Sequence, residues 1–107
     1  MKKILNEKLI NSIWNSNLEE TLELISKGAD VNYKDKNGNT PLMFSRTRKM
    51  ATLLIKKGAN IHVLNNQNTS VLSEIIYKEN KSVAKLLIEK GADINIKNNY
   101  GFTALFF

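Results

Sequence analysis

Gly28-Ala29-Asp30-Val31-Asn32 decides the fold of this chain, because the same pentapeptide returns twice with small changes. It reads Gly58-Ala59-Asn60-Ile61-His62 at its second occurrence and Gly91-Ala92-Asp93-Ile94-Asn95 at its third, and the second interval is three residues longer than the first. A period in the range of about 20–50 residues is typical of stacked structural repeats, in which each unit packs on its neighbours. The repeat therefore predicts recognition across an extended surface rather than chemistry in a pocket.

Each pentapeptide belongs to a longer frame that recurs in the same order. Apolar helical stretches precede the glycines, at residues 22–27, 52–57 and 85–90. A glycine after a helix that ends in lysine is a C-terminal stop, because glycine tolerates the left-handed conformation. Ten residues after each first glycine a second turn position follows, occupied by Gly38, Asn68 or Gly101.

The next helix begins two residues later, at Thr40-Pro41-Leu42, Ser70-Val71-Leu72 or Thr103-Ala104-Leu105. Asp35 to Gly38 has the composition of a turn. Thr40 is a candidate helix N-cap, with Pro41 at the first helical position, where the missing N–H group is not needed. Each unit is therefore predicted to run turn, helix, short turn, helix, loop.

This frame resembles the ankyrin repeat, which opens with Gly-x-Thr-Pro-Leu and ends with Leu-Leu-x-x-x-Gly-Ala-Asp-Val-Asn within about 33 residues. The resemblance covers residues 7–107 and is closest over residues 38–62. It implies an all-α, ankyrin-type solenoid of stacked helix-turn-helix units with projecting hairpin loops. The single domain at 1–107 is divided into an N-terminal capping repeat at 1–35, a short repeat at 36–65, a full repeat at 66–98 and a truncated last repeat at 99–107.

The spacing within the frame locates a deletion in the middle unit. The interval from Thr40 to Gly58 is three residues shorter than the equivalent interval from Ser70 to Gly91. The three missing residues fall within 44–49, between the two helices. The middle unit is therefore predicted to have a shorter first helix or a tighter turn.

The two ends of the stack differ in polarity. Glu20 and Glu23 stand where later units have apolar residues, namely Met50 and Leu53, and Val83 and Leu86. Terminal units of a solenoid need a polar outer face, so the charges indicate a cap. At the other end, the sequence leaves two alternatives open for Phe106 and Phe107: packing back on the stack, or a self-association edge.

Little in the composition suggests catalysis. The chain has no cysteine and one histidine, His62, which replaces the loop asparagine of its repeat. No glycine-rich phosphate loop is present, and the aspartates fall at turn positions rather than in a paired-carboxylate arrangement. We therefore expect no enzyme activity, no cofactor and no metal.

The location of the chain is predicted from its polarity. Polar residues interrupt any apolar core of a signal peptide, and no stretch approaches the about 20 apolar residues of a membrane span. We expect a cytoplasmic protein without a membrane partner, and delivery into a host cell stays open.

The net charge of +6 is concentrated in the middle of the chain, where residues 28–57 hold seven Lys or Arg against two Asp. Most of the excess comes from Arg46, Arg48, Lys49, Lys56 and Lys57. Such a patch favours an acidic partner. The alternative is a compositional bias, since lysine outnumbers arginine 14 to 2.

The resemblance also implies where a partner would bind, because ankyrin repeats hold ligands with loop tips and the exposed face of their first helices. Carried over residue by residue, the tip positions are Lys36, Asn37, Asn39, Asn66, Gln67, Thr69, Asn99, Tyr100 and Phe102. The first-helix positions are Ile10, Trp14, Met43, Arg46, Ser73, Tyr77, Lys78 and Phe106. Trp14 and Tyr77 occupy equivalent positions, seven residues after Glu7 and Ser70.

The sequence therefore predicts a non-catalytic protein–protein interaction module that binds a partner protein through its concave groove and loop tips. One alternative is binding of nucleic acid or another polyanion through the basic middle repeat. This is disfavoured because the cations do not run the length of the chain. The other alternative is a self-associating or structural fragment of a longer scaffold.

Overall fold

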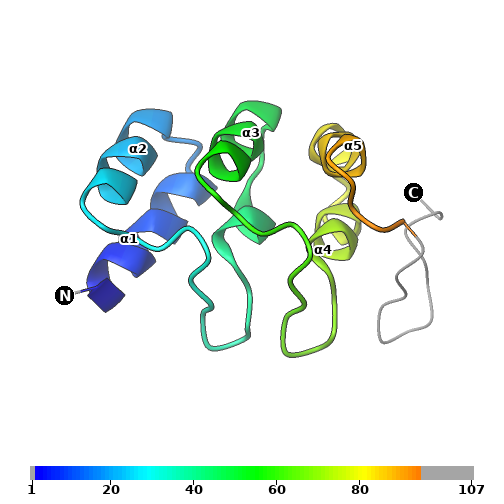
Figure 1. Ribbon diagram of the computed structural model, residues 1–107, viewed down its shortest axis with the longest axis horizontal. Coiled ribbons are helices and arrows are strands. Elements are labelled where there is room, and N and C mark those ends of the chain that lie inside the picture. The colour runs from blue at the N-terminus through cyan, green and yellow to red at the C-terminus, as the bar shows by residue number, and fades with distance from the viewer. Residues whose placement is uncertain (1, 95–107) are drawn as a thin grey trace.

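The structure, a computed structural model, describes residues 2–94 of the chain (Figure 1). Within this range the elements are α1 (Lys2–Trp14), α2 (Leu18–Ser26), the 3-10 turn η1 (Pro41–Phe44), α3 (Arg48–Lys56), α4 (Val71–Tyr77) and α5 (Lys81–Glu89). Figure 1 shows α2, α3 and α5 in one row, with α1, η1 and α4 in a second row beneath it. The described residues contain no strand, only an isolated antiparallel bridge between Leu64 and Ser70. The predicted all-α stack of helix pairs is confirmed, and the unit boundaries at residues 35, 65 and 98 stay predictions.

The repeated Gly-Ala pair ends the second helix of every unit in the same way. After α2, the Gly28 N–H bonds the Ile25 carbonyl and the Ala29 N–H bonds the Leu24 carbonyl, both at 3.0 Å. These two bonds form a Schellman motif, which requires a left-handed residue, and Gly28 has φ +105°. Gly58-Ala59 and Gly91-Ala92 make the same pair of bonds. The motif that recurs in the sequence is thus a recurring helix end.

The core follows the boundary between the two rows of helices. Its largest fully buried side chains are Leu9, Ile13, Leu42, Met43, Met50, Leu54, Leu72, Ile75 and Leu87. Burying one such side chain contributes roughly 1.5–3 kcal/mol. Glu20 is exposed on α2, whereas Met50 and Val83 at the same repeat position are fully buried. At this repeat position the first unit therefore has an exposed charged side chain, whereas the later units have a buried apolar one.

The deletion shortens the first helix of the middle unit, as the spacing predicts. The 3-10 turn η1 has four residues, against seven in α4 and 13 in α1. η1 still contacts α1 on one side and α4 on the other. The middle unit therefore keeps its place in the stack with one helix turn fewer.

Thr40 occupies the N-cap position of η1 and Pro41 the first helical position, as predicted, but the Thr40 side chain makes no capping hydrogen bond. A capping hydroxyl would accept a hydrogen bond from the Met43 N–H. This N–H instead donates to the Thr40 backbone carbonyl, at 3.0 Å. The Thr40 Oγ1 atom is buried and has no hydrogen-bond partner within residues 2–94. Thr40 is therefore the N-cap by position, as predicted, but its hydroxyl does not cap the helix.

Replacing Thr40 with valine is expected to raise the free energy of unfolding by about 1 kcal/mol, because a buried hydroxyl without a partner is unfavourable. The matched control is Thr47→Val, because the Thr47 hydroxyl does cap its helix by accepting the Met50 N–H at 3.1 Å. This control should lower the free energy of unfolding by about 1 kcal/mol. Urea denaturation measures both changes, and a loss of stability in Thr40→Val would show that its hydroxyl has a partner.

Candidate functional site

The predicted tip residues that fall within residues 2–94 lie on two neighbouring loops that project from the stack (Figure 1). The loops are joined directly: the Asn66 N–H bonds the Asn37 carbonyl, and the Asn66 Nδ2 atom donates to the Lys36 carbonyl, both at 3.0 Å. Lys36, Asn37, Asn66 and Gln67 remain exposed at the tips. The exposed tip side chains are therefore carried by two loops whose backbones are held together by hydrogen bonds.

Sequence reasoning missed the residue that organises the second loop, the buried Asn65. Its Oδ1 atom accepts the N–H groups of Gln67 and Thr69, and its Nδ2 atom donates to Asn39 Oδ1 and Glu74 Oε1, both at 2.9 Å. Residues around it line a hollow of about 290 Å³ at the tips. The signal was available, since Asp35 stands at the equivalent position one repeat earlier and accepts the equivalent N–H groups of its own loop.

Two of the predicted first-helix residues are not available to a partner. Met43 is fully buried in η1, and Ser73 is buried in α4, where it accepts a hydrogen bond from Ser70 Oγ at 3.0 Å. Met43 lies in η1, which packs between α1 and α4, and Ser73 occupies the equivalent position of α4. Their assignment to the binding surface is wrong.

The aromatic residues predicted at equivalent positions are both exposed, to different degrees. Tyr77, the last residue of α4, is 81% exposed, and Trp14, the last residue of α1, is 45% exposed. Ile10 and Thr69 are half-buried. The predicted positions Asn99, Tyr100, Phe102 and Phe106, and Phe107, lie outside the described residues.

Trp14 is partly covered by Arg46, from the turn that follows η1. The guanidinium carbon of Arg46 lies 4.7 Å from the centroid of the Trp14 ring, and Arg46 Nη1 donates to the Trp14 carbonyl at 3.3 Å. On the other side, Asn80 Nδ2 donates to the Arg46 carbonyl at 2.9 Å. Arg46 thus connects the first, middle and third units.

Lys78 makes a second connection to the middle unit. Its Nζ atom donates to the Met43 carbonyl at 2.8 Å and lies 4.9 Å from the centroid of the Phe44 ring. Partial burial lowers the pKa of Lys78, and the neighbouring Glu74 carboxylate opposes the shift. Arg46 and Lys78, predicted as partner contacts, therefore also hold the units together.

A concave region of about 570 Å³ opens where the turns between first and second helices meet. We call it the notch, and it is lined by Trp14, Ser45, Arg46, Lys78, Glu79, Asn80, Lys81 and Ser82. It brings together predicted residues from three units. It was not predicted, because the deletion could be counted in the sequence while the surface that it opens could not.

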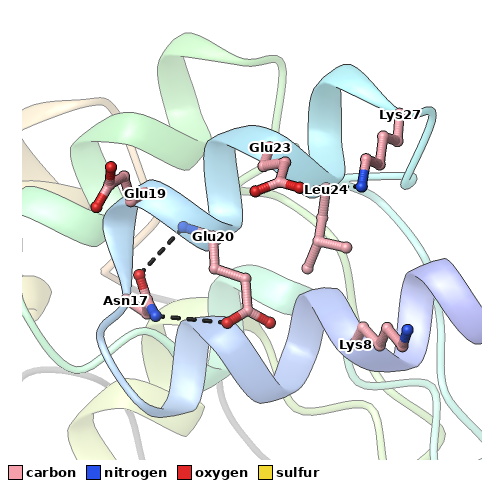
Figure 2. A pocket seen from close by; sticks show the side chains of 7 residues that line it. All are labelled: Lys8, Asn17, Glu19, Glu20, Glu23, Leu24 and Lys27. Atoms are coloured by element: carbon pink, nitrogen blue, oxygen red, sulfur yellow. Dashed lines mark hydrogen bonds and ion pairs between the residues drawn. The ribbon is translucent and has the colours of Figure 1, made fainter.

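Another hollow, of about 430 Å³, lies on the outer face of the first unit (Figure 2) and is lined by Lys8, Asn17, Glu19, Glu20, Glu23, Leu24 and Lys27. Its polar groups are largely engaged with one another. Asn17 caps α2 by accepting the Glu20 N–H at 3.1 Å, and Glu23 pairs with Lys27 at 2.9 Å. Figure 2 shows Leu24 pointing toward α1 beneath these charges. This face has the polarity expected at the end of a stack.

Among residues 2–94, no group of three histidine, aspartate or glutamate side chains lies close enough to hold a metal ion. None of the helices described there is long and apolar enough to cross a membrane.

Comparison with known proteins identifies the family. A family model described as ankyrin repeats in three copies matches residues 9–98. Among curated proteins, ankyrin repeat protein FPV219 of Fowlpox virus (strain NVSL) is 39% identical over 67 residues, which cover 60% of this chain and 15% of that protein. Protein lin-12 of Caenorhabditis elegans is 38% identical over 60 residues, which cover 53% of this chain and 4% of that protein. The similarity to these two relatives therefore spans a small part of their length. The chain belongs to the ankyrin-repeat family.

Proposed function

We propose that this domain binds a partner protein through its loop tips and the exposed face of its first helices, without catalysing a reaction. Ankyrin repeats are generally protein–protein interaction modules, and the family is generally non-catalytic. The observation that carries the proposal is Tyr77, an aromatic side chain left 81% exposed on a helix whose other apolar residues mostly pack into the core. Tyrosine and tryptophan dominate the energetics of protein interfaces, so Tyr77 and Trp14 are the proposed anchors.

The rigidity of the tips supports the same proposal. Asn66 is tied to the backbone of the preceding loop, and Asn65 fixes its own loop through its buried side chain. Loops that are ordered before binding lose little conformational entropy when a partner arrives. The exposed side chains of Lys36 and Gln67 would then add hydrogen bonds at the rim.

Replacing Tyr77 with alanine is expected to weaken partner binding by about 30-fold, the effect of losing roughly 2 kcal/mol at an interface anchor. The partner would first be captured from the source cell with the wild-type domain. Affinity would then be measured for Tyr77→Ala and for the double variant Trp14→Ala/Tyr77→Ala. Ile88→Ala is the control, because Ile88 is also exposed but lies on α5, in the row of second helices. Undiminished binding by the double variant would contradict the proposed surface.

A further inference from the structure

The notch is a direct product of the deletion in the middle unit. The residue directly before the N-cap of the second helix is Ser16 in the first unit, Arg46 in the middle unit and Glu79 in the third. Ser16 and Glu79 both adopt the left-handed backbone conformation, with φ +57° and +59°. They follow the ends of α1 and α4, which are both longer than η1. The flanking helices thus extend beyond the floor formed by Ser45 and Arg46. The concavity lies between them.

The floor and walls of the notch carry an excess of positive charge. Arg46, Lys78 and Lys81 line it against the single carboxylate of Glu79. Lys78 is committed to the Met43 carbonyl, whereas Arg46 makes one side-chain hydrogen bond among the described residues, through Nη1. A guanidinium carries five N–H donors in a planar fork, so most of the donors of Arg46 are not used by residues 2–94.

Trp14 holds this fork in place. A guanidinium that is stacked on an aromatic ring loses less conformational entropy when it binds a carboxylate, and its geometry allows two parallel hydrogen bonds. The exposed part of the Trp14 ring supplies apolar surface beside the charge. An anionic group and a neighbouring apolar group would both find a contact here.

We propose that the notch binds an acidic segment of a partner protein, with one carboxylate paired to Arg46 above the Trp14 ring. The observations favour a peptide over a nucleic acid, because the cations are clustered rather than aligned in a track for successive phosphates. The inference rests on the proposed function in taking the ligand to be a protein. The notch is separate from the loop tips but shares Trp14 with the proposed first-helix surface.

The test uses hexaglutamate with blocked ends as a probe, titrated into the full chain. Trp14 is the only tryptophan of the chain, so its indole N–H signal in NMR spectra reports on the notch alone. We expect a saturable shift of this signal. Arg46→Gln should weaken the binding by about tenfold, because the charge-assisted fork is lost.

Two further variants separate a local site from a general attraction of charge. Lys56→Gln also removes one positive charge, but at the C-terminal end of α3, whereas Arg46 precedes its N-terminal end. It should change the affinity for hexaglutamate by less than about twofold, because salt screens distant charges. Glu79→Gln should tighten the binding by about threefold, because it removes the negative charge next to the bound carboxylate. Circular dichroism would verify that each variant is folded.

Three outcomes would overturn the inference. The first is an unchanged Trp14 signal, and the second is an equal loss of affinity in Arg46→Gln and Lys56→Gln. The third is tighter binding of oligothymidylate than of hexaglutamate with a steep dependence on salt, which would assign the notch to a nucleic-acid backbone. The notch can fail separately from the proposed function: a partner that is lost with Tyr77→Ala but kept with Arg46→Gln would refute the notch alone.

Discussion

Leu54→Ala is expected to lower the free energy of unfolding by about 2–5 kcal/mol, through lost burial and the cavity that the missing atoms leave. Leu54 is fully buried on α3, in the middle unit. α3 contacts α5 and η1, and η1 contacts α1 and α4, so this unit connects both flanking units. Because neighbouring interfaces supply much of the stability of a solenoid, a defect here weakens the whole stack.

Urea denaturation followed by circular dichroism measures this effect. Leu22→Ala is the matched control, since Leu22 lies on α2 with 42% of its surface exposed. It should change the free energy of unfolding by less than about 1 kcal/mol, as exposed substitutions usually do. We expect one shifted transition for Leu54→Ala, because the flanking units cannot bury their apolar faces alone. Equal effects of the two substitutions would contradict the central position of Leu54.

Helix ends and register could be predicted from the sequence because they depend on local interactions. The two bonds that close α2 at Gly28 and Ala29 reach back only a few residues, to Ile25 and Leu24. The same residue types therefore produce the same helix end wherever they recur. The shortening of the middle unit was equally accessible, because a deletion between fixed markers can be located by counting. Counting left open whether the first helix or the turn after it is shorter.

The side-chain environments could not be predicted in the same way. Met43 belongs to a first helix, and the sequence places it at a groove-facing position of the repeat. Its burial depends on the flanking α1 and α4, which no local pattern describes, and Ser73 at the equivalent position of α4 is buried too. Thr40 is a similar case, because its backbone carbonyl takes the hydrogen bond that its hydroxyl was expected to receive.

The candidate site shows the same division between local and long-range contacts. The sequence identified Trp14 and Arg46 as exposed candidates, but their contact joins residues 32 positions apart. The loop-to-loop bonds of Asn65 and Asn66 span 26 and 30 positions. Such pairings arise from the stacking distance between units. They also change the interpretation of the tips, where asparagines that were predicted as partner contacts already bind one another.

Gly38→Asn is expected to lower the free energy of unfolding by about 2–4 kcal/mol, the combined effect of overpacking and of lost hydrogen bonds. Gly38 lies in a turn and has φ +78°. This positive φ alone does not require a glycine. At the equivalent position of the next unit, Asn68 adopts φ +59°. Asparagine tolerates the left-handed region, so backbone strain alone would make this substitution mild.

The close approach of the next loop makes the substitution severe. A Cβ atom on Gly38 would lie 2.5 Å from Asn66 Oδ1 and 2.7 Å from the Asn66 backbone nitrogen. The second distance involves main chain, so the loop itself would have to move away. This movement would break the bonds from Asn66 to the carbonyls of Asn37 and Lys36.

Two measurements separate this explanation from simple strain in the turn. In Gly38→Asn, hydrogen exchange at the Asn66 amide should become faster, because its bond to the Asn37 carbonyl is lost. The reciprocal variant Asn68→Gly keeps a residue that adopts positive φ readily, and it should change the free energy of unfolding by less than about 1 kcal/mol. If Gly38→Asn were as mild as Asn68→Gly and left the Asn66 amide protected, the contact between the two loops would not be what requires glycine at position 38.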